Sequence, residues 1–526
     1  MPRRLELFFE TALVFVVFSI QGAWPVPDVN EPYYLGKAIH FWNSNWARGD
    51  FFLETADAHQ VFYLTFGWLA LLLPPVALAW FGRILTWGLL AWAWQKLSRS
   101  VVPRRGWAVL TAAIFVATLD RYHMAGEWVV GGVEAKGFAF VLVFLGLEAL
   151  VRNRWNQVWI LLGAASAFHV LVGGWTVLAA GGAWLFAGGD RPSLRSMAAA
   201  LVAGGLLSLP GLIPSARLTL GVAPAVAERA NLIYVFARLP HHLAPLSLPN
   251  WPDYVVRFAA LVVVLVVVYR VTPAEPGSRR LRLLVIASLL IAAIGLGINL
   301  MADYRPSLAA GLLRFYWFRL SDVAVPLGLS LAIAERLSLL EGQRPRWALA
   351  LFAALVLATG IHLIDLGRYR VVRLPPRSHW HLRWTGSWQL ATQWIANSGE
   401  IPPDARFLTP RLSHTFKWFT GRPEVATWKD IPQDAESIVA WWDRLLDIYA
   451  TGSKIPGQEW YASFGEMSED RVRELARKYG AQYVLSYRRP RELKLDVVYR
   501  NRFYVVYQVT DSDAADEAAT LEPQRR

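Results

Sequence analysis

The residues from Pro25 to Gln60 carry the groups in this sequence that are best suited to chemistry. They follow directly on the first apolar stretch and combine acids with aromatic rings. Asp28 and Glu31 are the first two carboxylates of the segment, and a carboxylate can act as a general base or bind a metal. Ionisable groups at the edge of a bilayer are costly unless they are solvated, paired or used. This segment is therefore the first candidate for a reaction site.

Three more charged segments lie between apolar stretches, at residues 120–136, 216–246 and 302–322. Their carboxylates could supply a base or metal ligands, and their arginines could clamp a phosphate through paired N–H donors. A site for a lipid-linked anionic substrate needs such a set on one side of the bilayer. The candidate side chains are Glu127, Glu134, Lys136, His241, His242, Arg305, Arg314 and Arg319.

Structural roles compete with catalytic ones for several of these residues. Asp28 and Glu31 precede Pro32, which is typical of a helix start, where acids cap free amide groups and favour the helix dipole. Capping and catalysis are both open for these two acids. His241 and His242 would point about 100° apart on a helix, which favours a solvated interfacial pair over two ligands of one metal ion.

The basic residues of the other segments also have structural interpretations. Arg314 and Arg319 flank the aromatic run FYWF, so snorkelling to lipid head groups competes with a phosphate-binding role. Glu134 and Lys136 stand at the start of an apolar stretch, where a salt bridge between them would be structural. No phosphate loop, dinucleotide fingerprint, HExxH or GxSxG motif occurs in the sequence, so nucleotide hydrolysis and the common hydrolase mechanisms lack support.

The composition predicts a membrane protein. Of 526 residues, 55% are hydrophobic and only 18% charged, whereas soluble domains carry about a quarter charged residues. The mean hydropathy is +0.31. The net charge of +13 comes from Lys and Arg in short clusters between apolar runs. This distribution is typical of the cytoplasmic loops of a membrane protein, which follow the positive-inside rule, and it argues against a nucleic-acid partner. The chain contains no cysteine, which excludes disulfides, thiolate metal sites and cysteine nucleophiles.

A spanning helix needs about 20 mostly apolar residues, and we expect eleven such helices. We interpret residues 60–74, which end in Pro74 and are followed by Pro75, as an interfacial or re-entrant helix. With the N-terminus in the cytoplasm, every cytoplasmic loop is basic, as the positive-inside rule requires, and the C-terminus lies outside. The expected spans are 7–23, 75–96, 106–120, 137–151, 157–170, 172–189, 196–213, 254–270, 281–301, 320–337 and 346–364.

The character of the sequence changes after about residue 366. Periodicity there predicts helices at 386–397, 433–449 and 468–479, and strands at 405–409, 482–487, 494–499 and 503–509. Residues 414–427 are expected to form a hairpin that turns at Gly421. The predicted domains are a polytopic membrane domain (1–366, with its first outer loop at 24–74), an extracytoplasmic α/β domain (367–511) and a disordered tail (512–526).

The segment from Asp28 to Phe52 resembles the first outer loop of the GT-C superfamily, the polytopic glycosyltransferases that use polyprenyl-phosphate sugars. In its aminoarabinose transferases and protein O-mannosyltransferases, an acidic pair is followed by Tyr and by a short amphipathic helix ending in Gly-Asp. The counterparts here are Asp28 or Glu31, Tyr34, Lys37–Ala38 and Gly49–Asp50. The usual adjacent Asp-Glu pair is split in this chain, so which acid would act as the base stays open.

The resemblance implies a GT-C-like fold and a transferase in the bacterial inner membrane that moves a sugar from a polyprenyl-phosphate donor to an extracytoplasmic acceptor. Asp28 or Glu31 would be the base, an arginine at 305, 314 or 319 would hold the phosphate, and Glu127 or Glu134 would orient the sugar or the base. Tyr34, Lys37, Lys136, His241 and His242 complete the expected substrate site. A divalent metal is left open. The alternatives are a transporter or lipid flippase, and a GT-C-like protein without catalysis.

Overall fold

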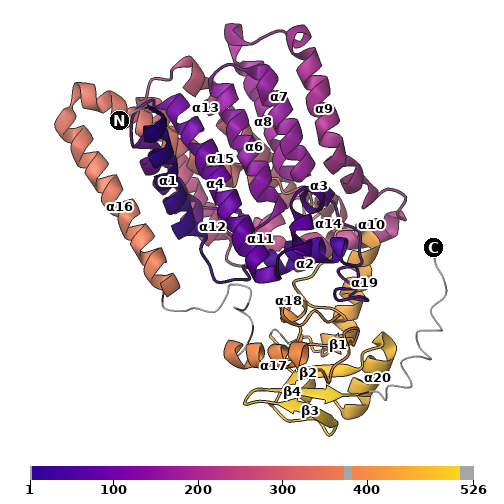
Figure 1. Cartoon of the computed structure of the whole chain (residues 1–526). Helices are drawn as coiled ribbons and strands as arrows, with labels where there is room; N and C mark the ends of the chain where they lie inside the picture. Colours follow the sequence, from indigo (N-terminus) through magenta and orange to yellow (C-terminus); the bar gives the residue numbers. More distant parts are fainter. Residues whose placement is uncertain (1–2, 372–378, 380–381, 383, 456, 510–526) are drawn as a thin grey trace. The chain divides into compact units, whose positions relative to one another are not determined.

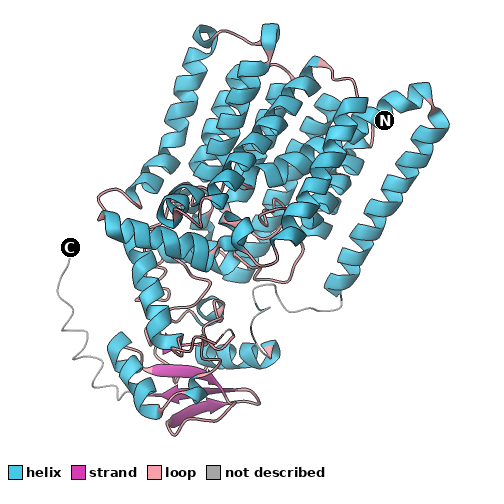
Figure 2. Ribbon diagram, turned by 180° about the vertical axis from the view of Figure 1, so that it is seen from behind, coloured by secondary structure: helices cyan, strands magenta, loops and turns pink. Residues whose placement is uncertain are grey.

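Apolar helices make up most of the chain up to residue 371 (Figures 1 and 2). The structure is a computed structural model that describes residues 3–371, 379, 382, 384–455 and 457–509. Within these residues seven helices are long and apolar enough to cross a membrane, which supports a multi-pass membrane protein. They are α1 (Arg3–Gly22), α4 (Pro75–Val101), α9 (Leu194–Arg217), α12 (Trp251–Val271), α13 (Pro276–Leu300), α15 (Arg319–Gln343) and α16 (Pro345–Val371).

The four other predicted spans are also helical, but they are shorter than the bilayer requires. They contain 14 to 17 residues each, against the roughly 20 of a full span, so the expected number of eleven is not confirmed. Between two of these helices, His169 alone breaks the chain with an extended backbone. The four helices are α5 (Trp107–Arg121), α6 (Ala135–Val151), α7 (Trp155–Phe168) and α8 (Val170–Phe186).

Short helical elements connect the long ones. Residues 60–74, predicted as an interfacial or re-entrant helix, contain two of them, α3 (Gln60–Thr65) and η1 (Gly67–Leu71). Their placement at a membrane surface stays a prediction. The others are α2 (Glu31–Trp42), η2 (Gly188–Asp190), α10 (Pro224–Leu232), the π-helix η3 (Ile233–Arg238), α11 (Pro240–Leu243), η4 (Pro245–Ser247) and α14 (Pro306–Leu313).

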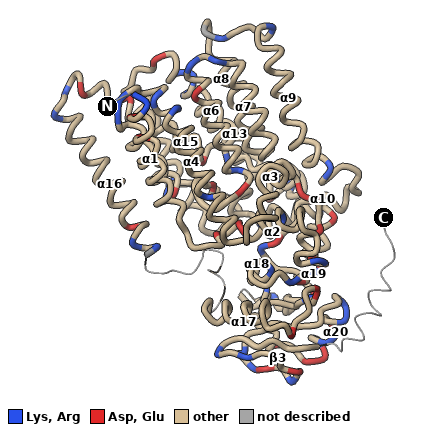
Figure 3. The backbone as a smooth tube through the Cα atoms, in the orientation of Figure 1, with Lys and Arg blue, Asp and Glu red and all other residues tan. Residues whose placement is uncertain are grey.

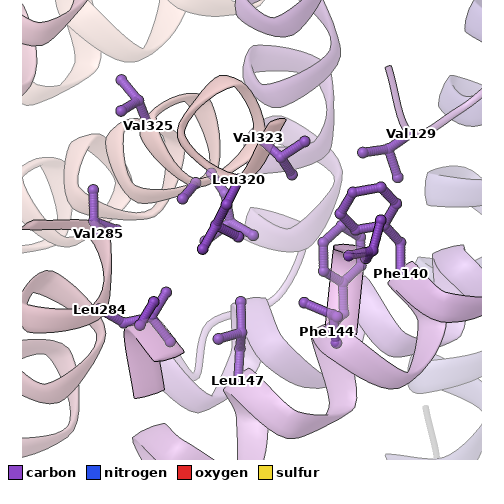
Figure 4. Packing of buried hydrophobic residues seen from close by; sticks show 14 of the residues in the cluster. Val129, Phe140, Phe144, Leu147, Leu284, Val285, Leu320, Val323 and Val325 are labelled. Atoms are coloured by element: carbon purple, nitrogen blue, oxygen red, sulfur yellow. The ribbon is translucent and has the colours of Figure 1, made fainter. Parts of the chain in front are cut away.

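The core of the helical part is a continuous apolar cluster. Figure 4 shows Phe144 and Leu147 of α6 beside Leu284 of α13 and Leu320 of α15, all of them buried. Where α7 and α9 cross, no side chain separates the two backbones. A Cβ atom added at Gly204 would overlap the carbonyl oxygen of Trp159, and small residues at such crossings let membrane helices approach closely.

By its contacts the chain separates into two compact units. Unit 1 comprises residues 1–24, 58–62 and 80–374, and unit 2 comprises residues 25–57, 63–79 and 375–526. The segment that follows α1 is thus grouped with the C-terminal part of the chain. The predicted division at residue 366 into a membrane domain and an outer domain stays a prediction.

The C-terminal part of unit 2 is a small mixed sheet with helices, as predicted. The strands β1 (Phe407–Leu408), β2 (Tyr483–Tyr487), β3 (Asp496–Arg500) and β4 (Tyr504–Gln508) have the order β1-β2-β4-β3. β1 runs parallel to β2, and the other neighbours are antiparallel. Alternate residues of β2 and β4 pack with Trp388 in one core cluster, because successive side chains of a strand point to opposite faces. The three predicted helices are present as α17 (Thr385–Asn397), α19 (Ala435–Tyr449) and α20 (Glu469–Tyr479), and a short helix that was not predicted, η6 (Phe464–Glu466), precedes α20.

The hairpin predicted for residues 414–427 is wrong. Residues Phe416–Thr420 form a helix, α18, and Gly421 ends it with a φ of 64°. A glycine in the left-handed region serves as a helix C-cap as well as a turn residue, so the same signal fits both structures. The predicted disordered tail at 512–526 lies outside the described residues.

We predict that Gly204→Val forces α9 away from α7 and lowers the thermal unfolding midpoint of the purified protein by several degrees, because overpacking costs about 1–3 kcal/mol. Gly205→Val is the matched control, since a Cβ at that position meets nothing within 4 Å. Intrinsic tryptophan fluorescence during heating measures both midpoints. Equal midpoints for the two variants would contradict the close helix crossing.

Candidate functional site

The two acids proposed as bases lie at the start of α2, and both are fully buried. A carboxylate oxygen of Glu31 accepts a hydrogen bond of 2.7 Å from the backbone N–H of Asp28. A carboxylate oxygen of Asp28 accepts one of 2.8 Å from the N–H of Val29. Both N–H groups precede the helix, and the N-cap residue Asn30 makes no side-chain cap hydrogen bond, so these two bonds do not show the capping considered for the acids. They fix the orientation of both carboxylates.

Lys37 of α2 holds the segment that follows this helix against it. Its buried ammonium donates to the carbonyl oxygens of Leu53 and Thr55 at 3.3 and 2.6 Å and lies 4.7 Å from the ring centre of Phe52. Burial lowers the pKa of Lys37 to about 8, although nearby aspartates oppose this shift. Tyr34, the other predicted binding residue of α2, packs with its ring 5.3 Å from that of Tyr33.

A buried lysine, Lys417, joins the end of the same segment to the C-terminal part of unit 2. Its ammonium lies 3.3 Å from Asp50, 2.9 Å from Glu424 and 2.5 Å from Asp430, and no more than 4% of any of these four side chains is exposed. Asp50 also accepts hydrogen bonds from the backbone N–H groups of Leu53 and Glu424. We call Lys417, Asp50, Glu424 and Asp430 the lysine cluster.

The lysine cluster holds one positive charge among three carboxyl groups. Burial opposes the charged form of Lys417, but Asp430, Asp50 and Glu424 outweigh it and hold the lysine pKa well above its usual range. Burial raises the pKa of Glu424 from 4.5 to about 7, against the attraction of Lys417. Three ionised carboxylates would leave uncompensated negative charge in a dry site, so a proton on Glu424 lowers that cost.

In unit 1, Glu127 is the centre of a second buried charge network. Its carboxylate accepts from Lys136 at 2.9 Å and pairs with Arg319 at 2.8 Å. Glu134 lies 3.4 Å from the same lysine, so the structural salt bridge considered for Glu134 and Lys136 is present. We call Glu127, Glu134, Lys136 and Arg319 the Glu127 network. It brings together four of the predicted binding residues.

Asp322 and His169 hold this network in place. Both carboxylate oxygens of Asp322 accept backbone N–H groups of the segment from Met124 to Glu127, at 2.8–3.3 Å. The Nε2 atom of His169 lies 2.9 Å from an Nη atom of Arg319. Because arginine only donates hydrogen bonds, that nitrogen must be unprotonated, which makes the ring neutral. His169 is thus a packed, hydrogen-bonding histidine.

The remaining predicted residues fall into two groups. The rings of His241 and His242 are 4.1 Å apart, and His242 bonds the carbonyl oxygen of Ala125 at 2.6 Å. Arg314 is half-buried and donates to the side-chain oxygen of Asn231 at 2.8 Å, whereas Arg305 is exposed. Among the residues that the structure describes, neither arginine has a carboxylate within ion-pair distance, which distinguishes both from Arg319.

Sequence reasoning missed the lysine cluster and a buried arginine in α4. Arg83 is fully buried, donates to the carbonyl oxygen of Trp24 and lies 4.8 Å from the ring centre of Trp80. A single arginine in an apolar run was a readable signal for a functional or paired group. No comparable signal marked Lys417, because its partner Asp50 lies far away in the sequence. Within the described ranges, no group of three or more His, Asp or Glu residues could hold a metal ion.

We predict that Lys417→Met lowers the thermal unfolding midpoint strongly, because removing one partner of a buried ion pair costs about 3–5 kcal/mol. The control is Lys478→Met, which removes an exposed lysine from Asp447, where the expected loss is below about 1 kcal/mol. Scanning fluorimetry of both full-length variants measures the difference. A drop for Lys417→Met no larger than that of the control would refute a stabilising role of the cluster.

The raised pKa of Glu424 predicts a dependence on pH. Between pH 4.5 and about 7 the unfolded chain loses this proton before the folded chain does, so Glu424 lowers stability as the pH rises through that window. Glu424→Gln keeps an acceptor for the Thr409 hydroxyl, which lies 2.7 Å away, and removes the titration. We therefore expect the variant to gain stability relative to the wild type from pH 5 to pH 8. A constant difference between the two melting curves over this range would contradict the raised pKa.

Comparison with known proteins yields one partial match. A family described as a domain of unknown function, DUF6798, matches residues 386–448. That stretch runs from α17 to α19 and contains three members of the lysine cluster. No curated protein matches the chain.

Proposed function

We propose that this chain is a membrane glycosyltransferase of GT-C type that transfers a sugar from a polyprenyl-phosphate donor to an extracytoplasmic acceptor. The observation that carries the proposal is the pair Asp28 and Glu31, two fully buried carboxylates at the start of α2. They stand in the segment whose sequence resembles the acidic outer loop of that superfamily.

The reaction needs a base for the acceptor and a cation for the leaving phosphate. In the proposed step Asp28 or Glu31 takes the proton of an acceptor hydroxyl. The freed oxygen attacks the anomeric carbon, and the bond from that carbon to the polyprenyl phosphate breaks with inversion. Hydrogen bonds from the backbone to both acids support this role, because a base must be held in position.

The proposed phosphate ligands are Arg314 and Arg305. An arginine with no carboxylate partner keeps its N–H donors for a substrate, whereas Arg319 is already paired with Glu127. We therefore assign Arg319, Lys136 and Glu134 to positioning Glu127, which would orient the sugar. His241 and His242 lie beside this network through Ala125 and complete the proposed binding site.

The proposal includes a topology with eleven spans, a cytoplasmic N-terminus and an outer C-terminal domain in a bacterial inner membrane. Figure 3 supports the orientation, since Lys and Arg gather at the end of the helical part where α1 begins. Cytoplasmic loops are enriched in these residues. The transporter alternative would use buried charges such as Arg83 along a path through the membrane, but this guanidinium is already hydrogen-bonded to the Trp24 carbonyl oxygen.

We predict that Glu31→Gln or Asp28→Asn lowers turnover of a lipid-linked sugar in membranes about 10²–10⁴-fold, the usual contribution of a general base. Both substitutions keep an oxygen for the backbone hydrogen bonds, so the start of α2 is preserved. Glu54→Gln is the control, because Glu54 is an exposed acid of the same segment. Wild-type turnover in both buried-acid variants would remove these acids from the mechanism.

A further inference from the structure

The short helix α14 is apolar on two sides, and the described residues cover only one of them. Ala309, Ala310 and Leu313 are fully buried in the core cluster of unit 1. On the other side, Leu308 and Leu312 are 53% and 36% exposed. Their spacing of four residues places these two leucines on one face of the helix. α14 therefore carries an apolar face that the protein leaves open.

The composition of α14 does not fit a face in water. Its sequence, PSLAAGLL, contains no charged residue, and its single hydroxyl group, that of Ser307, donates to Glu228 of α10. In α17 of unit 2, by contrast, the exposed Leu390 has Gln389 and Gln393 as exposed neighbours, which is typical of a solvated helix face. A helix that is apolar all round lies in a protein core or in a membrane.

The exposed face of α14 adjoins the exposed side of α13, which is long and apolar enough to cross a membrane. Leu290 and Ile294 share that side of α13 and are 58% and 54% exposed. At the next position, a Cβ atom added at Gly295 would overlap that of Trp317. The indole N–H of Trp317 in turn donates to the carbonyl oxygen of Leu312 at 2.8 Å. This contact ties the end of α14 to α13 beside its exposed stripe.

The length and the flanks of α14 fit a helix that enters a leaflet without crossing the bilayer. Its eight residues span about 12 Å, against the roughly 30 Å of the hydrocarbon core. Tyr304, which is 84% exposed, and the exposed Arg305 precede the helix. Tyrosine is enriched at the head-group level of membranes, and arginine extends its charge to that level.

We propose that α14 is embedded in the bilayer leaflet that the C-terminal end of α13 reaches, and that its open face binds the hydrocarbon chains of membrane lipids. Leu308, Leu312 and Phe315, which is 47% exposed, form this lipid-binding face. Tyr304 and Arg305 lie at the head groups. The connection from α13 to α15 is then in part an intramembrane element, and not the fully polar loop that its charges suggest. The proposal does not depend on the transfer reaction proposed above.

The bound lipid lies near the Glu127 network, because only a few residues separate α14 from Arg319. Among them Tyr316 has a left-handed backbone, with a φ of 56°, which is uncommon for a residue other than glycine. The Tyr316 ring centre lies 4.1 Å from the guanidinium of Arg319, and its hydroxyl lies 3.0 Å from that of Tyr234. These contacts fix the connection that follows α14 against the network.

The test is the accessibility of spin labels in the full-length protein, labelled in detergent and then reconstituted in nanodiscs. The chain has no cysteine, so Leu308→Cys and Leu312→Cys each provide a single labelling site. Leu290→Cys on α13 and Leu390→Cys on α17 are the matched references, since these leucines are 58% and 57% exposed, close to the 53% of Leu308. Equal exposure leaves the surroundings as the variable.

We expect the labels at 308 and 312 to behave like the label at 290, with high accessibility to oxygen, which enters hydrocarbon, and low accessibility to a water-soluble nickel chelate. The label at 390 should show the reverse. Nickel accessibility at 308 and 312 equal to that at 390 would place the face in water and refute the proposal. Low accessibility to both reagents would show that a second protein chain covers the face, and would overturn lipid as its occupant.

A charge on the face gives an independent measurement. Leu308→Asp should lower the thermal unfolding midpoint in nanodiscs by several degrees, because a carboxylate is costly in hydrocarbon. Leu390→Asp is the control, since a surface substitution in water has little effect on stability. Equal shifts for the two variants would contradict the proposal. If Leu308→Asp does not fold, the label measurements decide between the outcomes.

Discussion

The packing of unit 2 depends on the ion pairs that the ammonium group of Lys417 makes. This ammonium group is almost completely buried and is surrounded by three carboxyl groups, which come from the segment after α2 and from the connection between α18 and α19. A single lysine in such a site would be expelled or neutralised, and three carboxylates alone would repel one another. The buried charges compensate one another only when all four side chains are together. The segment with Asp50 and the C-terminal part of the chain must therefore fold together.

Unit 1 follows the same physical rule with different residues. Glu127 would be an expensive charge among apolar helices, and Lys136 and Arg319 compensate it from the starts of α6 and α15. Asp322 is compensated by backbone N–H groups instead of a cation. The network fixes the segment between α5 and α6 against α15. In the proposed function, this rigidity would hold the charged groups in position for the anionic substrate.

Arg411 and Arg314 stand apart from this general pattern of compensation. Both are partly buried, and within the described residues neither is paired with a carboxylate. Arg411 rests on indole rings, and Arg314 bonds only a neutral amide. Their positive charge is therefore not neutralised by a neighbouring carboxylate, in contrast to that of Arg319.

The sequence by itself determined the helices, because an apolar run in lipid can satisfy its backbone groups only within a helix. All eleven predicted stretches are helical, and the pattern in residues 482–509 was sufficient to predict three strands, whose antiparallel pairing only the structure shows. Only the tertiary structure determined the ion pairs, because their partners form no periodic pattern in the sequence. The backbone N–H of Glu424 bonds Asp50 from 374 residues away, and no pattern near either residue announces the other. It also decided that Gly421 caps a helix, because the left-handed backbone of a glycine serves a turn and a helix end equally well.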